Sequence, residues 1–112
     1  MGKGTGLMQT LVGKAAQGDV GAFLELMDRN SLAMYKVARA ILNNDEDAAD
    51  AIQDTVLSCF EKLHTLEKPE YFKTWMTRIL INKCNGILRH HRREHLPGKL
   101  PEPSRPDMSL AE

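Results

Sequence analysis

Apolar residues in this sequence recur every three or four positions, and this spacing limits the possible folds more than any other feature. In the stretch "DEDAADAIQDTVLSCFEKL" the recurring positions are Ala48, Ile52, Val56, Phe60 and Leu63. Such spacing places side chains on one face of an α-helix. No stretch shows the apolar–polar alternation that indicates a β-strand. The sequence therefore predicts an all-α protein.

The same spacing predicts three further helices, at about residues 7–15, 20–42 and 71–93. Gly18 can end the first of them, and Asp19 can cap the second. The second is either one long helix or a helix that bends near Asn30-Ser31. Two asparagines then interrupt the pattern, and Asp45 can cap the helix that follows. We therefore expect a compact bundle of about four helices.

The composition suits a small soluble domain. The chain has 112 residues, of which 42% are hydrophobic, enough for one domain with a modest core. No apolar run has the length of a transmembrane helix, and "MGKGTGLMQT" lacks the apolar core of a signal peptide. Cys59 and Cys84 form no CxxC pair, so we expect free thiols in a reducing cytoplasm.

The formal net charge of zero hides an asymmetry along the chain. Residues 19–70 contain eleven acids and five bases, whereas residues 71–95 contain six bases and one acid. The first part should repel nucleic acid and the second should attract it. Two different partners fit this pattern better than one partner does.

The basic part begins with aromatic residues, in the stretch "YFKTWMTRILINKCNGILRHHRRE". Bases near the end of a helix also suit the helix dipole, so a solvated helix end is one interpretation. The aromatic residues favour binding of single-stranded nucleic acid, because unpaired bases stack on rings while cations follow the backbone. Tyr71, Phe72 and Trp75 cannot all point the same way. We expect Phe72 to lie in the core and Tyr71 or Trp75 to lie nearer the face that would bind DNA.

The chemical motifs of enzymes are missing from this chain. It contains no Gly-rich phosphate loop, no HExxH and no nucleophile motif, so we expect no catalytic activity and no cofactor. Cys84, His90, His91 and His95 could form a metal site, but their spacing matches no usual zinc pattern. Histidines beside arginines are more typical of a solvated basic face, so no metal is predicted.

The predicted helix in the stretch "DEDAADAIQDTVLSCFEKL" has an acidic polar side. Its residues are Asp47, Asp50, Gln53, Asp54 and Glu61. This side could dock a basic partner helix, or it could be an ordinary solvated face. Charge alone does not separate these two interpretations.

Two motifs together resemble region 2 of bacterial sigma factors of the sigma-70 superfamily, in particular the ECF (extracytoplasmic function) type. The first motif is D-x-x-D-A-x-Q-(D/E), present here in "DAADAIQDTVLSCF". The second follows about twenty residues later as F-x-x-W-(L/M)-x-x-I-x-x-N, present in "FKTWMTRILIN". The resemblance extends over roughly residues 7–93. It implies a compact helical domain with two functional faces.

The resemblance also implies partners and site residues. Gln53 and Asp54 match the Gln-Glu pair by which the family binds the clamp helices of the RNA polymerase β′ subunit, with Asp50 beside them. The loop and the last helix of the family capture the non-template strand of the promoter's minus-ten element, with one base flipped into a pocket at residues 64–72. The DNA-binding residues implied here are His64, Lys68, Tyr71, Phe72, Lys73, Trp75, Arg78, Asn82, Lys83, Arg89, Arg92 and Arg93. An anti-sigma factor is a further partner that the family admits.

The sequence departs from the family pattern at two positions in the last helix. Leu80 replaces a frequent Ala, and Gly86 replaces a frequent Asp or Asn. Glycine inside a helix costs about 1 kcal/mol, so the helix can bend or fray there. Contacts to the promoter should be affected most.

The expected organisation is a helical domain at residues 1–95 and a Pro-rich linker or tail at 96–112. Nothing resembles region 4 of the family, so the chain is expected to be part of a longer protein. Two other functions remain open. One is a helical regulator that binds duplex DNA, and the other is an interaction module whose basic helix binds an acidic protein.

Overall fold

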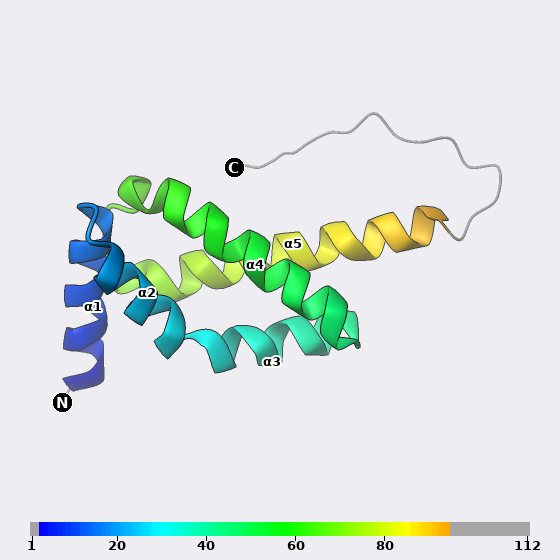
Figure 1. The fold of residues 1–112 in the computed structure, drawn as a ribbon, viewed down its shortest axis with the longest axis horizontal. Helices are drawn as coiled ribbons and strands as arrows, with labels where there is room; N and C mark the ends of the chain where they lie inside the picture. Colours follow the sequence, from blue (N-terminus) through cyan, green and yellow to red (C-terminus); the bar gives the residue numbers. More distant parts are fainter. Residues whose placement is uncertain (1–2, 95–112) are drawn as a thin grey trace.

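The fold is a helical bundle, seen in a computed structural model that describes residues 3–94 (Figure 1). Within this range every regular element is helical, so the all-α prediction is confirmed. In chain order the elements are α1 (Lys3–Ala16), α2 (Val20–Arg29), α3 (Ser31–Leu42), α4 (Asp45–Lys62), the 3-10 turns η1 (Leu63–Thr65) and η2 (Pro69–Tyr71), and α5 (Phe72–Glu94). The predicted Pro-rich tail and His95 lie outside the described residues.

The stretch 20–42 forms two helices, because the chain bends at Asn30. The side-chain amide of buried Asn30 donates to the carbonyl of Leu26 at 2.7 Å. In a continuous helix this carbonyl would accept the backbone N–H of Asn30, which here bonds to Met27 instead, at 3.1 Å. The bundle therefore has five α-helices in its described part, where about four were expected.

Local signals define the ends of the helices, with one correction. Gly18 ends α1 with a φ of 105°, and Asp19 caps α2 by accepting from the backbone N–H of Ala22. The cap of α4, however, is Asn44 rather than the predicted Asp45. The Oδ1 atom of Asn44 accepts from the N–H of Asp47 at 2.8 Å, and Asp45 becomes the first helical residue.

The buried face of α4 differs from the predicted apolar stripe. Its fully buried residues are small and lie on the adjacent side of the helix: Ala48, Ala51, Thr55 and Cys59. Small side chains let α4 pack closely against α3 and α5. The larger Ile52 and Val56 only flank this contact, and Phe60 lies on the outside. Phe60 therefore shares the helical spacing of the apolar set but does not share its burial.

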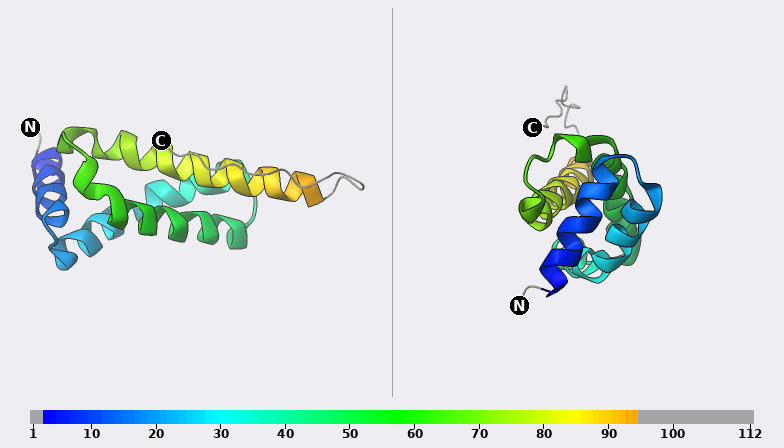
Figure 2. Two further views of the ribbon diagram at one scale, coloured as in Figure 1. Left: turned by 90° about the horizontal axis from the view of Figure 1, so that it is seen from above. Right: turned by 90° about the vertical axis from the view of Figure 1, so that its left-hand side faces the viewer.

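Helix α5 runs along the bundle and extends past the ends of α3 and α4 (Figures 1 and 2). Its buried stripe consists of Phe72, Met76, Leu80 and Cys84, which follow one another at intervals of four. Helix α1 packs on α2 and also contacts the two 3-10 turns, so it supports the loop that precedes α5. Within residues 3–94, no helix is apolar over a length sufficient to cross a bilayer.

Candidate functional site

The outer side of α4 carries a mixed polar and apolar surface, which we call the α4 face. It consists of Gln53, Asp54, Leu57 and Phe60, which lie on one side of the helix. Leu57 is 60% exposed and Phe60 is 57% exposed. Large apolar side chains with this exposure, rimmed by polar groups, are typical of a surface that binds another protein. The sequence interpretation found the two polar residues and missed the two apolar ones.

Phe60 is held in place although it is exposed. Its ring meets the buried ring of Phe23 on α2 edge to face, with the two centroids 5.2 Å apart. One edge of Phe60 is therefore anchored on the core, and the rest of the ring faces outward. The spacing in the sequence places residue 60 on the same side as residue 53, but the spacing alone does not show that Phe60 is exposed.

The loop between α4 and α5 presents one aromatic ring to the outside. Tyr71 is 57% exposed, and the ammonium of Lys68 lies 5.9 Å from the centre of its ring. Phe72 is fully buried, as expected, and Trp75 is partly buried with its ring 6.0 Å from that of Phe72. Because its side chain is covered, Phe72 does not belong among the residues able to touch a nucleic acid. Phe72 belongs to the core, and Trp75 packs against that core.

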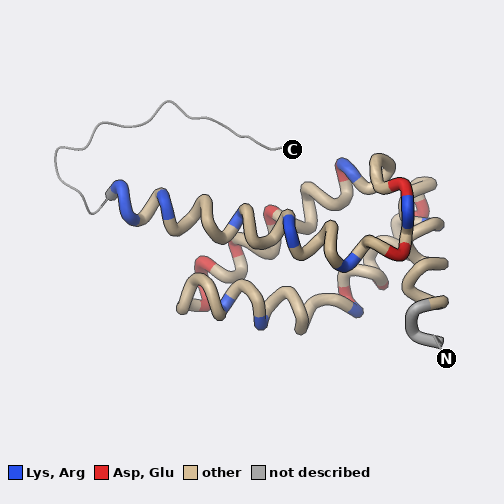
Figure 3. The backbone as a smooth tube through the Cα atoms, turned by 180° about the vertical axis from the view of Figure 1, so that it is seen from behind, with Lys and Arg blue, Asp and Glu red and all other residues tan. Residues whose placement is uncertain are grey.

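A row of polar and basic side chains follows one face of α5, and Figure 3 shows Lys and Arg recurring along this helix. We call it the α5 row; its members recur every three or four residues and are all exposed: Arg78, Asn82, Asn85, Arg89 and Arg92. At 1.5 Å per residue, the row extends for about 21 Å.

The other residues predicted to bind DNA differ in exposure. His64 and Lys73 are exposed, whereas Lys83 and Arg93 are partly buried.

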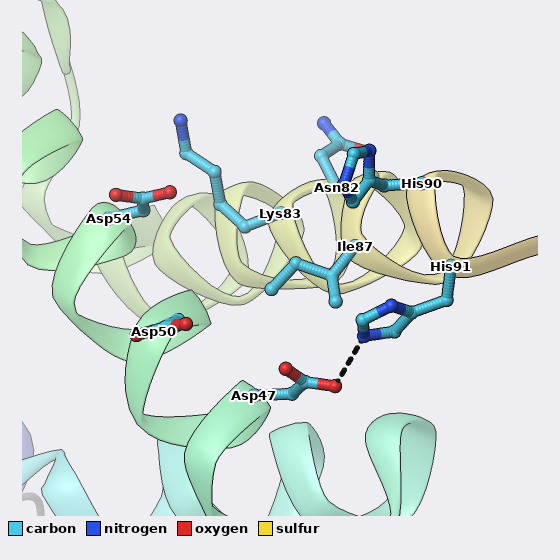
Figure 4. Close-up of a pocket in the computed structure, with 9 residues that line it drawn as sticks. Asp47, Asp50, Asp54, Asn82, Lys83, Ile87, His90 and His91 are labelled. Atoms are coloured by element: carbon cyan, nitrogen blue, oxygen red, sulfur yellow. Dashed lines mark hydrogen bonds and ion pairs between the residues drawn. The ribbon is translucent and has the colours of Figure 1, made fainter. Parts of the chain in front are cut away.

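A groove of about 400 Å³ lies between side chains of α4 and α5. Its α4 wall consists of Asp47, Asp50 and Asp54, and its α5 side is lined by Asn82, Lys83, Gly86, Ile87, His90 and His91 (Figure 4). Residues predicted for polymerase binding and for DNA binding thus meet across one groove. The acidic and basic parts of the sequence are adjacent surfaces, not opposite sides of the molecule.

Asp47 and His91 close one end of this groove. Nε2 of His91 lies 2.8 Å from Oδ2 of Asp47, and the amide of Asn44 donates to the same oxygen at 2.9 Å. The hydrogen bond from Asn44 and then that from His91 lower the pKa of Asp47, so its carboxyl group is ionised at neutral pH. A carboxylate only accepts hydrogen bonds, and therefore Nε2 of His91 is the donor.

Within residues 3–94, no group of three His, Cys, Asp or Glu side chains could hold a metal ion. Cys59 and Cys84 are both buried and free. Burial raises the pKa of Cys59 to about 12, against a smaller opposite effect of the charge on Lys83. Burial also raises the pKa of Cys84. Both thiols are therefore protonated at neutral pH.

Comparison with known sequences relates most of the chain to one family. The sequence model described as Sigma-70 region 2 matches residues 26–94. The chain is 31% identical over 87 residues to the RNA polymerase sigma factor NccH of Alcaligenes xylosoxydans xylosoxydans, covering 78% of this chain and 47% of that protein. It is 33% identical over 72 residues to the ECF RNA polymerase sigma factor SigM of Mycobacterium tuberculosis, covering 64% and 37%. The chain thus spans less than half the length of these curated relatives.

Two solved structures have a similar fold. An engineered region 2 of sigmaE, determined by NMR in complex with GTAAAA, matches with a TM-score of 0.71 at 24% identity, covering 78% of this chain and 90% of that one. CnrH in complex with the cytosolic domain of CnrY matches with a TM-score of 0.68 at 29% identity, covering 79% and 59%.

Proposed function

Since this chain belongs to the sigma-70 region 2 family, we propose that it binds core RNA polymerase and captures melted promoter DNA at the start of transcription. It does so by binding, without catalysing a reaction. The observation that carries the proposal is the presence of two differently built surfaces beside one groove. The α4 face has an apolar centre with polar neighbours, as protein interfaces do. The loop and the α5 row combine an exposed ring with cations, as surfaces for single strands do.

The α4 face is the proposed contact with the clamp helices of the polymerase β′ subunit. Gln53 and Asp54 supply hydrogen bonds and charge, and Asp50 extends the acidic surface toward the groove. Leu57 and Phe60 add the apolar surface that a protein contact buries. Full burial of such side chains contributes about 1.5–3 kcal/mol each, and these two are already part-covered, so each contributes less. Even so, Leu57 and Phe60 together should contribute to polymerase binding about as much as Gln53 and Asp54 do.

The loop and α5 are the proposed contact with the non-template strand of the minus-ten element. Tyr71 offers a ring on which a base can stack, a contact worth roughly 1–3 kcal/mol. Lys68, next to that ring, provides a charge for the adjoining phosphate. Asn82 can read a base edge through its amide, and the arginines of the α5 row can pair with phosphates. The related region 2 of sigmaE forms a complex with GTAAAA, and we infer a similar short strand for this chain.

An anti-sigma factor is a proposed third partner. The related protein CnrH forms a complex with the cytosolic domain of CnrY, which suggests that this chain also has a protein partner besides polymerase. Such a partner would act in the cytoplasm, where polymerase works, and a partner that covers Leu57 and Phe60 would compete with polymerase directly.

The experiment that tests the polymerase contact uses the chain with Gln53→Ala and Asp54→Ala together. We expect its affinity for core polymerase to fall by about tenfold or more, because the double change removes two polar side chains next to the apolar centre of the interface. Its helical circular dichroism should not change, and its binding to a single-stranded minus-ten oligonucleotide should not weaken. Lys36→Ala, an exposed change on α3, is the matched control. Unchanged polymerase affinity in the double variant would rule out this role for the α4 face.

A further inference from the structure

The α5 row functions as one surface only while α5 stays straight. From Arg78 to Arg92 its side chains share a face because each follows the last by three or four residues. Gly86 lies in the middle of the row, and glycine is the residue at which a helix bends or frays most easily. Ile87 and Leu88 still pack against the core, but the end of α5 extends past the ends of α3 and α4 (Figures 1 and 2). A bend at Gly86 would separate Arg89 and Arg92 from Arg78 and Asn82.

The hydrogen bond between His91 and Asp47 supports this segment. It joins two residues that are 44 positions apart, on the side of α5 that faces α4 (Figure 4). His91 lies about half a turn round the helix from Asn82, so the bond leaves the α5 row uncovered.

The carboxylate of Asp47 is itself a fixed anchor. It belongs to the first turn of α4, where Asn44 holds both its backbone N–H and its Oδ2 atom, at 2.8 Å and 2.9 Å. Its side chain is only 19% exposed, against 44% for His91. The first turn of α4 is also tied to α3, because the hydroxyl of Tyr35 donates to Asp45 at 2.9 Å. The bond thus connects the end of α5 to a turn that is itself hydrogen-bonded to α3.

We propose that Asp47 and His91 are positioning residues for strand binding: their hydrogen bond keeps the end of α5 in line, so that Arg89 and Arg92 meet the same strand as Arg78 and Asn82. The inference rests on the proposed capture of promoter DNA and adds two residues that do not touch the strand. It gives Asp47, a negatively charged residue, a role that favours DNA binding.

This role makes a prediction opposite to that of simple electrostatics. Asp47 carries a negative charge close to a surface that binds phosphates, so its removal should strengthen DNA binding if only charge matters. If Asp47 positions α5, its removal should weaken binding. Glu46 provides the matched control, because it is an exposed acid one residue earlier in the same helical turn.

The experiment measures the affinity of the chain for a single-stranded minus-ten oligonucleotide at several salt concentrations. We expect Asp47→Ala and His91→Ala each to weaken binding about threefold to tenfold, which is less than the full value of a hydrogen bond to a charged group, because the bond acts on the strand only through the position of α5. The double variant should bind no more weakly than the weaker-binding of the two single variants, because the second change acts on a bond that is already broken. His91→Gln, which keeps a side-chain N–H donor, should restore part of the affinity. Glu46→Ala should leave binding unchanged or slightly stronger.

Amide hydrogen exchange of residues 87–94 separates this inference from the proposed function. Exchange should be faster in Asp47→Ala than in the unchanged chain and in Glu46→Ala, whether or not DNA is present. If the unchanged chain does not bind the oligonucleotide at all, the proposed function fails, and exchange still reports whether the bond holds α5. The positioning role is overturned if Asp47→Ala strengthens DNA binding as charge alone predicts, or if exchange after Gly86 is unaffected.

Discussion

The ring of Phe60 rests edge-on against the ring of Phe23, with their centroids 5.2 Å apart, while 57% of Phe60 stays exposed. The contact with Phe23 thus fixes the orientation of the exposed Phe60 ring on the α4 face. A ring fixed in advance loses little conformational freedom when a partner covers it, which favours binding.

Phe60→Ala should weaken binding to core polymerase about tenfold or more, as expected for an aromatic residue at the centre of an interface. The free energy of unfolding should fall by only about 0.5–1.5 kcal/mol, the value of an aromatic pair, because the ring is mostly exposed. Polymerase affinity and urea unfolding would be measured on the same preparation. Leu32→Ala removes a similarly exposed side chain from α3 and should leave affinity intact. An equal effect of both changes would contradict a specific role for Phe60.

Tyr71 and Phe72 are neighbours in the sequence and should respond in opposite ways. Phe72→Ala creates a cavity in the core and should lower the free energy of unfolding by about 3–5 kcal/mol. Tyr71→Ala should change it by less than about 0.5 kcal/mol, because the ring is exposed. The same change should weaken oligonucleotide binding by roughly 1–3 kcal/mol, the value of one stacked base. Urea unfolding and fluorescence anisotropy would test this, and unaltered oligonucleotide binding by Tyr71→Ala would exclude stacking there.

The arginines of the α5 row should position the strand, and Asn82 should help to select its sequence. Arg89→Ala with Arg92→Ala should weaken binding to all single-base variants of the minus-ten element equally. The slope of log affinity against log salt should fall by roughly 0.7 for each phosphate that the variant no longer neutralises. Asn82→Ala should instead change which base is preferred. The affinity of each variant would be measured for a panel of single-base variants of the minus-ten element. A changed base preference in the arginine variant would contradict the positioning role of these arginines.

Asp47 should contribute to stability in a pH-dependent manner. Its pKa is lowered in the folded protein, so the fold favours the charged carboxylate. This contribution is therefore complete above the ordinary pKa of about 4 and is lost as the pH falls through the lower pKa of the folded state. The difference in unfolding free energy between the unchanged chain and Asp47→Asn should be largest near neutral pH and should close in acid. Urea unfolding from pH 7 down to pH 2 measures it, with Glu46→Gln for comparison. A difference as large at pH 2 as at pH 7 would contradict this assignment.

Cys59 and Cys84 should be unreactive in the folded protein. Both side chains are buried, and burial raises the pKa of each thiol, that of Cys59 to about 12. Because the thiolate is the reactive form, alkylation by iodoacetamide at pH 8 should be slow. Mass spectrometry should detect two rapid modifications only after a denaturant is added. Rapid labelling without denaturant would show that α4 and α5 separate readily.

The local part of the fold was open to prediction from the sequence. Helix positions follow from the spacing of apolar residues, and Gly18 and Asp19 act at helix ends through their own backbone and side chains. The break at Asn30 was one of two alternatives, because the stretch is compatible with a helix throughout. Asn44 was missed as a cap for a similar reason, since the adjacent Asp45 is also a good capping residue.

The sequence by itself determined that this chain forms amphipathic helices, acidic in the third predicted one and basic in the last, because both properties depend on residues only three or four positions apart. The tertiary structure alone decided which side of α4 is covered. On α4 the close approach of α3 and α5 selects the stripe of Ala48, Ala51 and Cys59, and it leaves Phe60 outside. The contact of Asp47 with His91 joins positions 44 residues apart, and no local pattern encodes it. Such contacts form only when the packed core brings distant helices together.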